Sequence, residues 1–220
     1  MRRAALLLVL AALAGCSGPV SSAPPDSRVE VTAGYPEGAL AGRSLAVVVG
    51  AVVVTDDAVA EHLGGSLDAA DETYRAFFAE ALPVAFQTAE VGEVRVADAA
   101  ALGLAATRPA DGARFDALDA DFVLLLDTLH VDRAVYYRTV AGAPNPQTGA
   151  MSQRTVSDHN LRIDAGVVLW DNRAGAEVAA GRLDTERSLP IVGRSRATYE
   201  DAVREFVEQL ARFTPLSLRR

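Results

Sequence analysis

The side chains of this sequence that are best suited to acid–base or metal chemistry are three histidines and the carboxylates near them. His62, His130 and His159 are the only histidines, so a histidine triad or a zinc site would have to use them. If the strands that carry His130 and His159 pair, the two imidazoles could meet Asp132 or Asp158 in a weak metal or acid–base site. The alternative is that these are surface histidines beside acids. No H-E-x-x-H or G-x-S-x-G motif accompanies them.

Two groups of aspartates could also bind a cation or take part in catalysis. Asp116, Asp119 and Asp121 precede an expected strand and offer oxygen ligands for a divalent cation, or they only solvate the entry to that strand. Asp56 and Asp57 follow an apolar strand, where α/β proteins often place catalytic groups, or they form its polar exit. The EF-hand pattern is absent. We therefore predict no catalytic residue, no metal site and no cofactor, and the protein is not expected to be an enzyme.

A third candidate is a contact surface built from Tyr136, Tyr137 and Arg138. Tyrosine and arginine are enriched at the centres of protein interfaces. The segment 138–157 that follows is rich in glycine and proline, which predicts a loop or the tip of a long hairpin. A long irregular segment in a compact domain is often functional. The alternative is that the tyrosines only cover the end of the sheet.

The composition excludes several function classes. All 21 basic residues are arginine, which removes P-loop and Schiff-base lysines. Half of the residues are apolar and 23% are charged, as expected of a chain that buries a core. The net charge is −8, and it becomes 19 − 29 = −10 if Arg2 and Arg3 are removed with a leader. Nucleic acids and anionic lipid surfaces are then poor partners, because both favour clustered positive charge.

The first sixteen residues have the layout of a secretory signal peptide. Two arginines follow the start, and an apolar run extends from Ala4 to Ala14. A helix over this run would be about 16 Å long, against a hydrocarbon core of about 30 Å, so it is too short to span a membrane. Small residues follow, and the run ends at Leu13-Ala14-Gly15-Cys16, which contains the only cysteine of the chain.

This tetrapeptide resembles the lipobox of bacterial lipoproteins. The resemblance implies cleavage before Cys16 (residues 1–15 being the signal peptide), diacylglycerol on its thiol and a fatty acid such as palmitate on its amine. Ser17 in place of aspartate implies the outer membrane, with the domain on the periplasmic face. The alternative is an ordinary secretory leader with a coincidental cysteine. Residues 16–30 are expected to be the lipidated end and a linker rich in serine and proline. Eleven extended residues reach about 35–40 Å at most, which keeps the domain near its membrane.

The remaining chain, 31–220, is expected to fold as one α+β domain. The expected elements are a strand over 44–54 bent at Gly50, a helix over 66–85 that Pro83 kinks or ends, and a short strand over 91–96. They continue with a short helix and polar loop over 98–118, a strand over 121–137, a hairpin of 161–169 with 177–188 about the turn 171–175, and a helix over 198–213. The prediction is a single antiparallel or mixed sheet of four to five strands with two main helices, in the order β-α-β-β-β-β-α.

The order of these elements from Arg43 to Phe213 is similar, at the level of pattern, to several groups of envelope lipoproteins. These are the auxiliary lipoproteins of ABC transport systems, the penicillin-binding-protein activators and the curli secretion lipoprotein. The resemblance carries no functional residues across. We therefore expect a lipid-anchored accessory protein that acts by contact with an envelope protein near the membrane. The alternatives are a metal-assisted periplasmic hydrolase using His130 and His159, and a binder of lipid or another small ligand with its cavity between helix and sheet.

Overall fold

The computed structural model describes residues 27–31, 35, 38–88, 91–99, 102, 109–110, 112–144, 146–190 and 195–213. Cys16, the leader and most of the linker lie outside the described residues. The strands are β1 (Arg28–Val31), β2 (Leu45–Val49), β3 (Val52–Val54), β4 (Val94–Asp98), β5 (Phe122–Leu126), β6 (Leu129–Pro144), β7 (Met151–Asp171) and β8 (Ala176–Ser188). The helices are α1 (Asp57–Leu63), α2 (Leu67–Thr88) and α3 (Arg196–Phe213), with a 3₁₀ turn, η1, at Asp116–Leu118.

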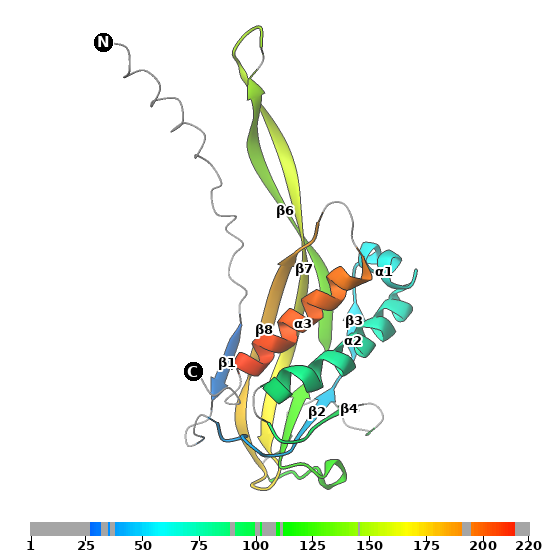
Figure 1. Cartoon of the computed structure of the whole chain (residues 1–220), viewed down its shortest axis with the longest axis vertical. Coiled ribbons are helices and arrows are strands. Elements are labelled where there is room, and N and C mark those ends of the chain that lie inside the picture. Colours follow the sequence, from blue (N-terminus) through cyan, green and yellow to red (C-terminus); the bar gives the residue numbers. More distant parts are fainter. Residues whose placement is uncertain are drawn as a thin grey trace, which may run out of the picture.

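One mixed sheet of eight strands forms the centre of the molecule (Figure 1). Its main order is β1-β8-β7-β5-β2-β4, with β6 pairing β7 and β3 pairing β6. The prediction of four to five strands and two main helices was therefore wrong. The prediction missed β1 inside the expected linker, missed α1, and treated two broken strands as continuous. The β2–β4, β2–β5 and β3–β6 pairs are parallel, and the others are antiparallel.

Two neighbouring parallel strands break at the same level of the sheet. Gly50 and Ala51 separate β2 from β3, and Asp127 and Thr128 separate β5 from β6. The two breaks are joined because the Gly50 N–H donates to the Leu126 carbonyl at 2.9 Å. An added Cβ on Gly50 would lie 2.8 Å from that oxygen, so the close approach requires glycine there.

The paired break reverses which residues face the helices. Along β5 the helix-facing core residues have even numbers (Leu124 and Leu126), whereas along β6 they have odd numbers (Leu129 and Val131). A continuous strand over 121–137, as predicted, would place Val123 and Leu125 on the same face as Leu129 and Val131, and this is wrong. The cause is one extra residue. Leu126 pairs with Val167 and His130 with Asp164, so four steps along the broken strand match three along β7.

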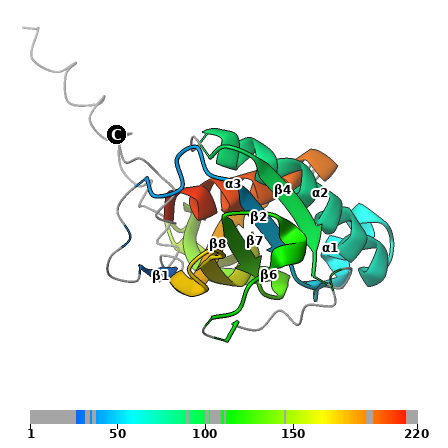
Figure 2. The ribbon, with the colours of Figure 1, turned by 90° about the horizontal axis from the view of Figure 1, so that it is seen from below.

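The three helices lie together on one face of the sheet (Figure 2). α2 and α3 pack on each other through Phe78 and Phe206, whose rings meet edge to face with centroids 5.7 Å apart. α2 begins after Ser66, whose hydroxyl accepts from the Ala69 N–H, and it continues past Pro83 to Thr88. The apolar face beyond Pro83, including the fully buried Phe86, holds the helix on the sheet. None of the described helices is long and apolar enough to cross a membrane.

A smaller core lies on the opposite face of the sheet, at the end where β5 starts. Trp170 is fully buried there and its indole N–H donates to the Ala113 carbonyl at 3.0 Å. Leu118 of η1 and Ala99 cover it from the connection between β4 and β5. The sheet residues of this second core share the face away from the helices: Ala46, Val48, Val123, Leu125, Trp170.

Candidate functional site

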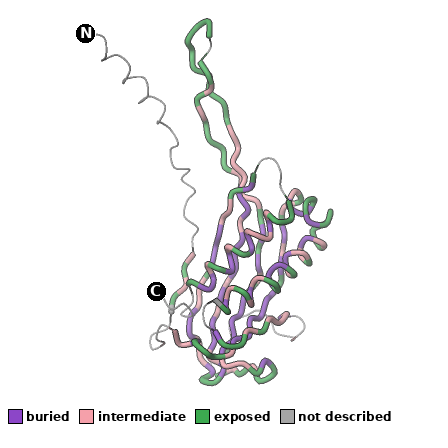
Figure 3. Tube along the Cα trace, in the orientation of Figure 1, coloured by how far each residue is buried: buried purple, intermediate pink, exposed green. Residues whose placement is uncertain are grey.

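The most distinctive part of the molecule is a two-stranded arm formed by the far halves of β6 and β7 (Figure 1). We define the arm as residues 136–157. β3 pairs with β6 only up to Val131, and β8 pairs with β7 only from Asn160, so within the described chain the arm strands pair only with each other. Figure 3 shows its backbone trace as exposed or intermediate along its length. The arm confirms that 138–157 forms the tip of a long hairpin.

The predicted contact residues lie where the arm leaves the body. Tyr137 is 75% exposed. Tyr136 points to the opposite face, where its hydroxyl donates to Glu186 at 2.7 and 2.9 Å. This hydrogen bond, followed by partial burial and the charge of Glu186, raises the pKa of Tyr136. Arg138 donates from Nε to Asp158 at 2.6 Å, so the guanidinium is held against the opposite strand. Tyr136 is therefore fixed to the body, while Tyr137 is presented to solvent.

The face of the sheet away from the helices carries a ladder of ion pairs on β7 and β8. Arg162 donates from Nε to Asp184 at 3.0 Å and also from Nη2. Arg182 donates to Asp164. Asp164 and Asp184 stand directly opposite each other, and each arginine reaches its partner diagonally. The hydrogen bond to Asp184 is the main reason that the pKa of Arg162 is raised.

This ladder fixes the register between β7 and β8. The Asp184 side chain is only 4% exposed, and the guanidinium of Arg162 is the ion-pair partner of its carboxylate. Slipping β8 by one residue would move these charges to the helix-facing side. The ladder was not predicted, although its signal is present in the sequence as alternating charges in Arg162-Ile163-Asp164 and Arg182-Leu183-Asp184.

The structure keeps the candidate histidines apart. His130 pairs with Asp164 and His159 with Val135, five residues further along β6. Residues an odd number of steps apart on a strand face opposite sides, so the two imidazoles lie on different faces. His62 is on α1, where Nδ1 lies 2.7 Å from the Ala58 carbonyl. Among the described residues no group of three or more His, Cys, Asp or Glu is placed to hold a metal.

The candidate aspartates lie in capping, ion-pairing or exposed positions. Asp56 caps α1 by accepting from the Val59 N–H at 3.1 Å and also pairs with Arg133 at 3.0 Å. Asp57 lies in the first turn of the same helix. Asp119 is 93% exposed and Asp116 starts η1.

Asp121 is the most tightly held of these carboxylates. Its Oδ2 accepts from the backbone N–H and the hydroxyl of Ser44, both at 3.1 Å. Burial alone would raise the pKa of Asp121, but these hydrogen bonds and the charges of Arg173 and Arg43 hold it below its ordinary value of 3.8. Asp121 thereby ties the starts of β2 and β5 to the β7–β8 turn.

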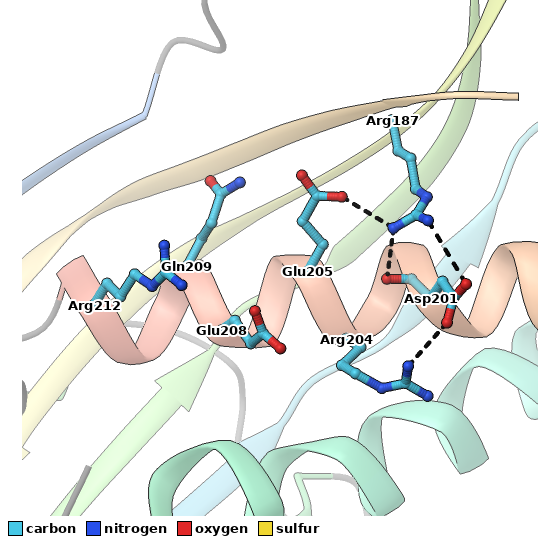
Figure 4. A pocket seen from close by; sticks show the side chains of 7 residues that line it. All are labelled: Arg187, Asp201, Arg204, Glu205, Glu208, Gln209 and Arg212. Carbon is cyan, nitrogen blue, oxygen red and sulfur yellow. Dashed lines mark hydrogen bonds and ion pairs between the residues drawn. The ribbon is translucent and has the colours of Figure 1, made fainter. Parts of the chain in front are cut away.

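A polar hollow of about 460 Å³ lies on the solvent side of α3 (Figure 4). Arg187 at the end of β8 pairs there with Glu205 at 3.2 Å and with Asp201 at 3.6 Å. Arg204 pairs with Asp201 at 2.9 Å. Side chains of α3 such as Phe206 fill the space between helix and sheet. The hollow is lined by Arg187, Asp201, Arg204, Glu205, Glu208, Gln209 and Arg212. A lining of three arginines and three acids is poorly matched to an acyl chain.

The fold defines the class: a mixed α/β sheet domain with helices on one face and a projecting β-hairpin. No family model matches the chain, and no curated protein matches it. Among solved structures, a PelC dodecamer from Paraburkholderia phytofirmans is similar at 16% identity and a TM-score of 0.39, with 88% of this chain and 99% of that chain covered. A structure from Helicobacter pylori, described as a homolog of a neuraminyllactose-binding hemagglutinin, is similar at 7% identity and a TM-score of 0.36, with 87% and 90% covered. Likenesses this weak carry no argument about function, residues or partners.

Proposed function

We propose that the chain is an outer-membrane lipoprotein, anchored through Cys16, that acts without catalysis by holding an envelope protein against its arm. The observation that carries the proposal is the arm itself. A two-stranded ribbon is marginally stable alone, and additional strands or packing normally support it. In the described chain the arm has neither, and both of its edges offer unpaired backbone groups.

The base of the arm supplies the contact chemistry. Tyr137 presents a large aromatic surface, and Tyr136 and Arg138 are already held by Glu186 and Asp158. Side chains that are fixed before binding lose less conformational entropy when a partner arrives. A partner strand or loop that pairs with the ribbon would cover the backbone edge and the aromatic side chain together.

A photo-crosslinking amino acid in place of Tyr137 tests this function in cells. The expected result is a discrete crosslinked partner, which is lost when Cys16→Ala leaves the protein unanchored. The matched control replaces Ala174, an exposed residue in the turn at the far end of the sheet. No adduct at Tyr137, or the same adduct from position 174, would overturn the proposed contact surface.

The opposite faces on which His130 and His159 lie do not support the alternative of a metal-assisted hydrolase that uses both histidines. A His130→Ala, His159→Ala double variant should therefore retain the Tyr137 crosslink and the cellular function. Metal analysis of the purified protein provides an independent test of the same alternative.

A further inference from the structure

The direction of β1 relates the membrane anchor to the arm. β1 and β7 both run antiparallel to β8, so β1 and β7 point the same way. β7 starts at the arm tip, and therefore the start of β1 faces the end of the sheet from which the arm projects (Figure 1). Ser27, just before β1, is fixed at the level of Asp184: its hydroxyl donates to the Asp184 carbonyl at 2.7 Å and accepts from the Asp184 N–H at 3.0 Å.

The length of the tether can be compared with the length of the arm. From Cys16 to Ser27 there are eleven steps, which reach at most about 40 Å when fully extended. Asp184 pairs with Asp164, and Asp164 lies thirteen residue steps along β7 from its first residue, Met151. At about 3.3 Å per residue the arm extends about 43 Å beyond the point where the tether is fixed. The arm is therefore at least as long as the tether. If the arm points towards the membrane, its tip reaches the membrane surface even when a fully extended tether holds the body as far away as possible.

The charge of the arm differs from that of the rest of the chain. Residues 136–157 contain two arginines and no acid, a formal charge of +2; Arg138 pairs with Asp158 beside the arm, so Arg154 is the charge that lies towards the tip. Since the whole chain carries −8, the remainder carries −8 − 2 = −10. The fifteen residues 139–153 include no charged side chain, and Met151 among them is 62% exposed. The prediction that anionic lipid is a poor partner rested on the total charge, and the arm is the exception to it.

We infer that the arm tip rests on the lipid headgroups of the membrane that holds Cys16, so that the body stands at a fixed height above that membrane. This inference rests on the proposed lipid anchor. The tip can meet the headgroup layer without burying a charge, while Arg154 nearby attracts anionic lipid. The tip does not enter the hydrocarbon, because the outer edges of a two-stranded ribbon leave backbone groups unsatisfied there. The base of the arm, seven residues or about 23 Å from Pro144, stays in the aqueous layer for the protein partner.

The test uses the full acylated protein in vesicles of phosphatidylcholine and phosphatidylglycerol. Cys16 is the only cysteine and its thiol is acylated, so Ala150→Cys introduces a single reactive thiol at the tip for a polarity-sensitive fluorophore. Ala174→Cys is the matched control at the opposite end of the sheet. The expected result is a blue shift and quenching by headgroup-labelled lipid at position 150 only. On these vesicles, Arg154→Gln should lower the ratio of membrane-bound to unbound arm tips about fivefold.

The possible failures are distinguishable. Protein that is not acylated and does not float with the vesicles would overturn the proposed anchor and this inference with it. Acylated protein that floats but shows the position 150 probe in water would overturn the inference alone. A probe that is shielded only when membrane proteins are also present would replace lipid with a membrane protein as the occupant of the tip.

Discussion

Gly181→Ala should release β1 from the edge of the sheet. Gly181 lies opposite Val29, and a Cβ at that position would stand 2.0 Å from the Arg28 carbonyl oxygen and 2.6 Å from the Val29 Cα. Both contacts are with backbone, so no side-chain rotation relieves them. The response that costs the least free energy is for the four residues of β1 to detach and leave the other seven strands in place.

The magnitude is limited by how strongly β1 is held. The ladder hydrogen bonds and the two bonds of Ser27 contribute about 0.5–1.5 kcal/mol each, and the partly buried Val29 adds about 1 kcal/mol. Ordering the strand costs about 1–2 kcal/mol per residue. These gains and costs are of similar size, so the loss of unfolding free energy should not exceed about 3 kcal/mol.

Urea unfolding and amide exchange of the mature domain measure the two parts of this prediction. The Glu30 amide, which faces β8 opposite Ala180, should exchange as in an unfolded chain, while the amides of β7 remain protected. The control is a chain that begins after β1, in which Gly181→Ala should cost nothing. Continued protection of the Glu30 amide in the variant, or a large loss that persists in the shortened chain, would refute the reasoning.

Three further outcomes are expected. Because the folded pKa of Asp121 is lowered, its stabilisation is complete above the ordinary value of 3.8 and lost as the pH falls through the folded pKa; Asp121→Asn should cost about 1–2 kcal/mol at pH 7 by urea unfolding, and this cost should shrink as the pH falls through the folded pKa. Arg162→Met leaves the buried Asp184 charge unpaired and should lower stability by about 3–5 kcal/mol, which the additional change Asp184→Leu should largely restore. Metal titration of the purified protein should give no saturable zinc site, and stoichiometric binding lost in the His130→Ala, His159→Ala variant would contradict the separation of the histidines.

The fold was predictable where one face of a helix or strand is buried and the other is exposed to solvent. β8 and α3 were predicted to within about two residues, and the turn over 171–175 was confirmed, because alternation and helical spacing report burial directly. β1 was missed because four residues at a sheet edge carry too little pattern. The strand predicted over 121–137 failed at Asp127, since one extra residue changes which face is buried without changing the apolar composition.

The candidate site was only partly predictable for a related reason. The arm has no buried face, so periodicity could not distinguish its strands from a loop, and only the glycines and prolines indicated a hairpin tip. Tyr136 and Tyr137 were predicted as contact residues from their residue type. Which of them is held by the body and which is exposed depends on the face of the strand that each side chain occupies. The ladder of Arg162 with Asp184 requires the β7–β8 register, which a single sequence does not supply.

The paired break in the sheet restricts which insertions and deletions the chain can accept. β2–β3 and β5–β6 each contain the extra residue, and they stay in register because they contain it together. Deleting Ala51 alone would misalign β3 with β6, and deleting Thr128 alone would do so from the other side. Deleting both would restore the β3–β6 pairing but turn Val52, Val54 and Val131 away from the helices. Length changes in this region therefore have to occur in compensating pairs and still preserve the side of the sheet on which each valine lies.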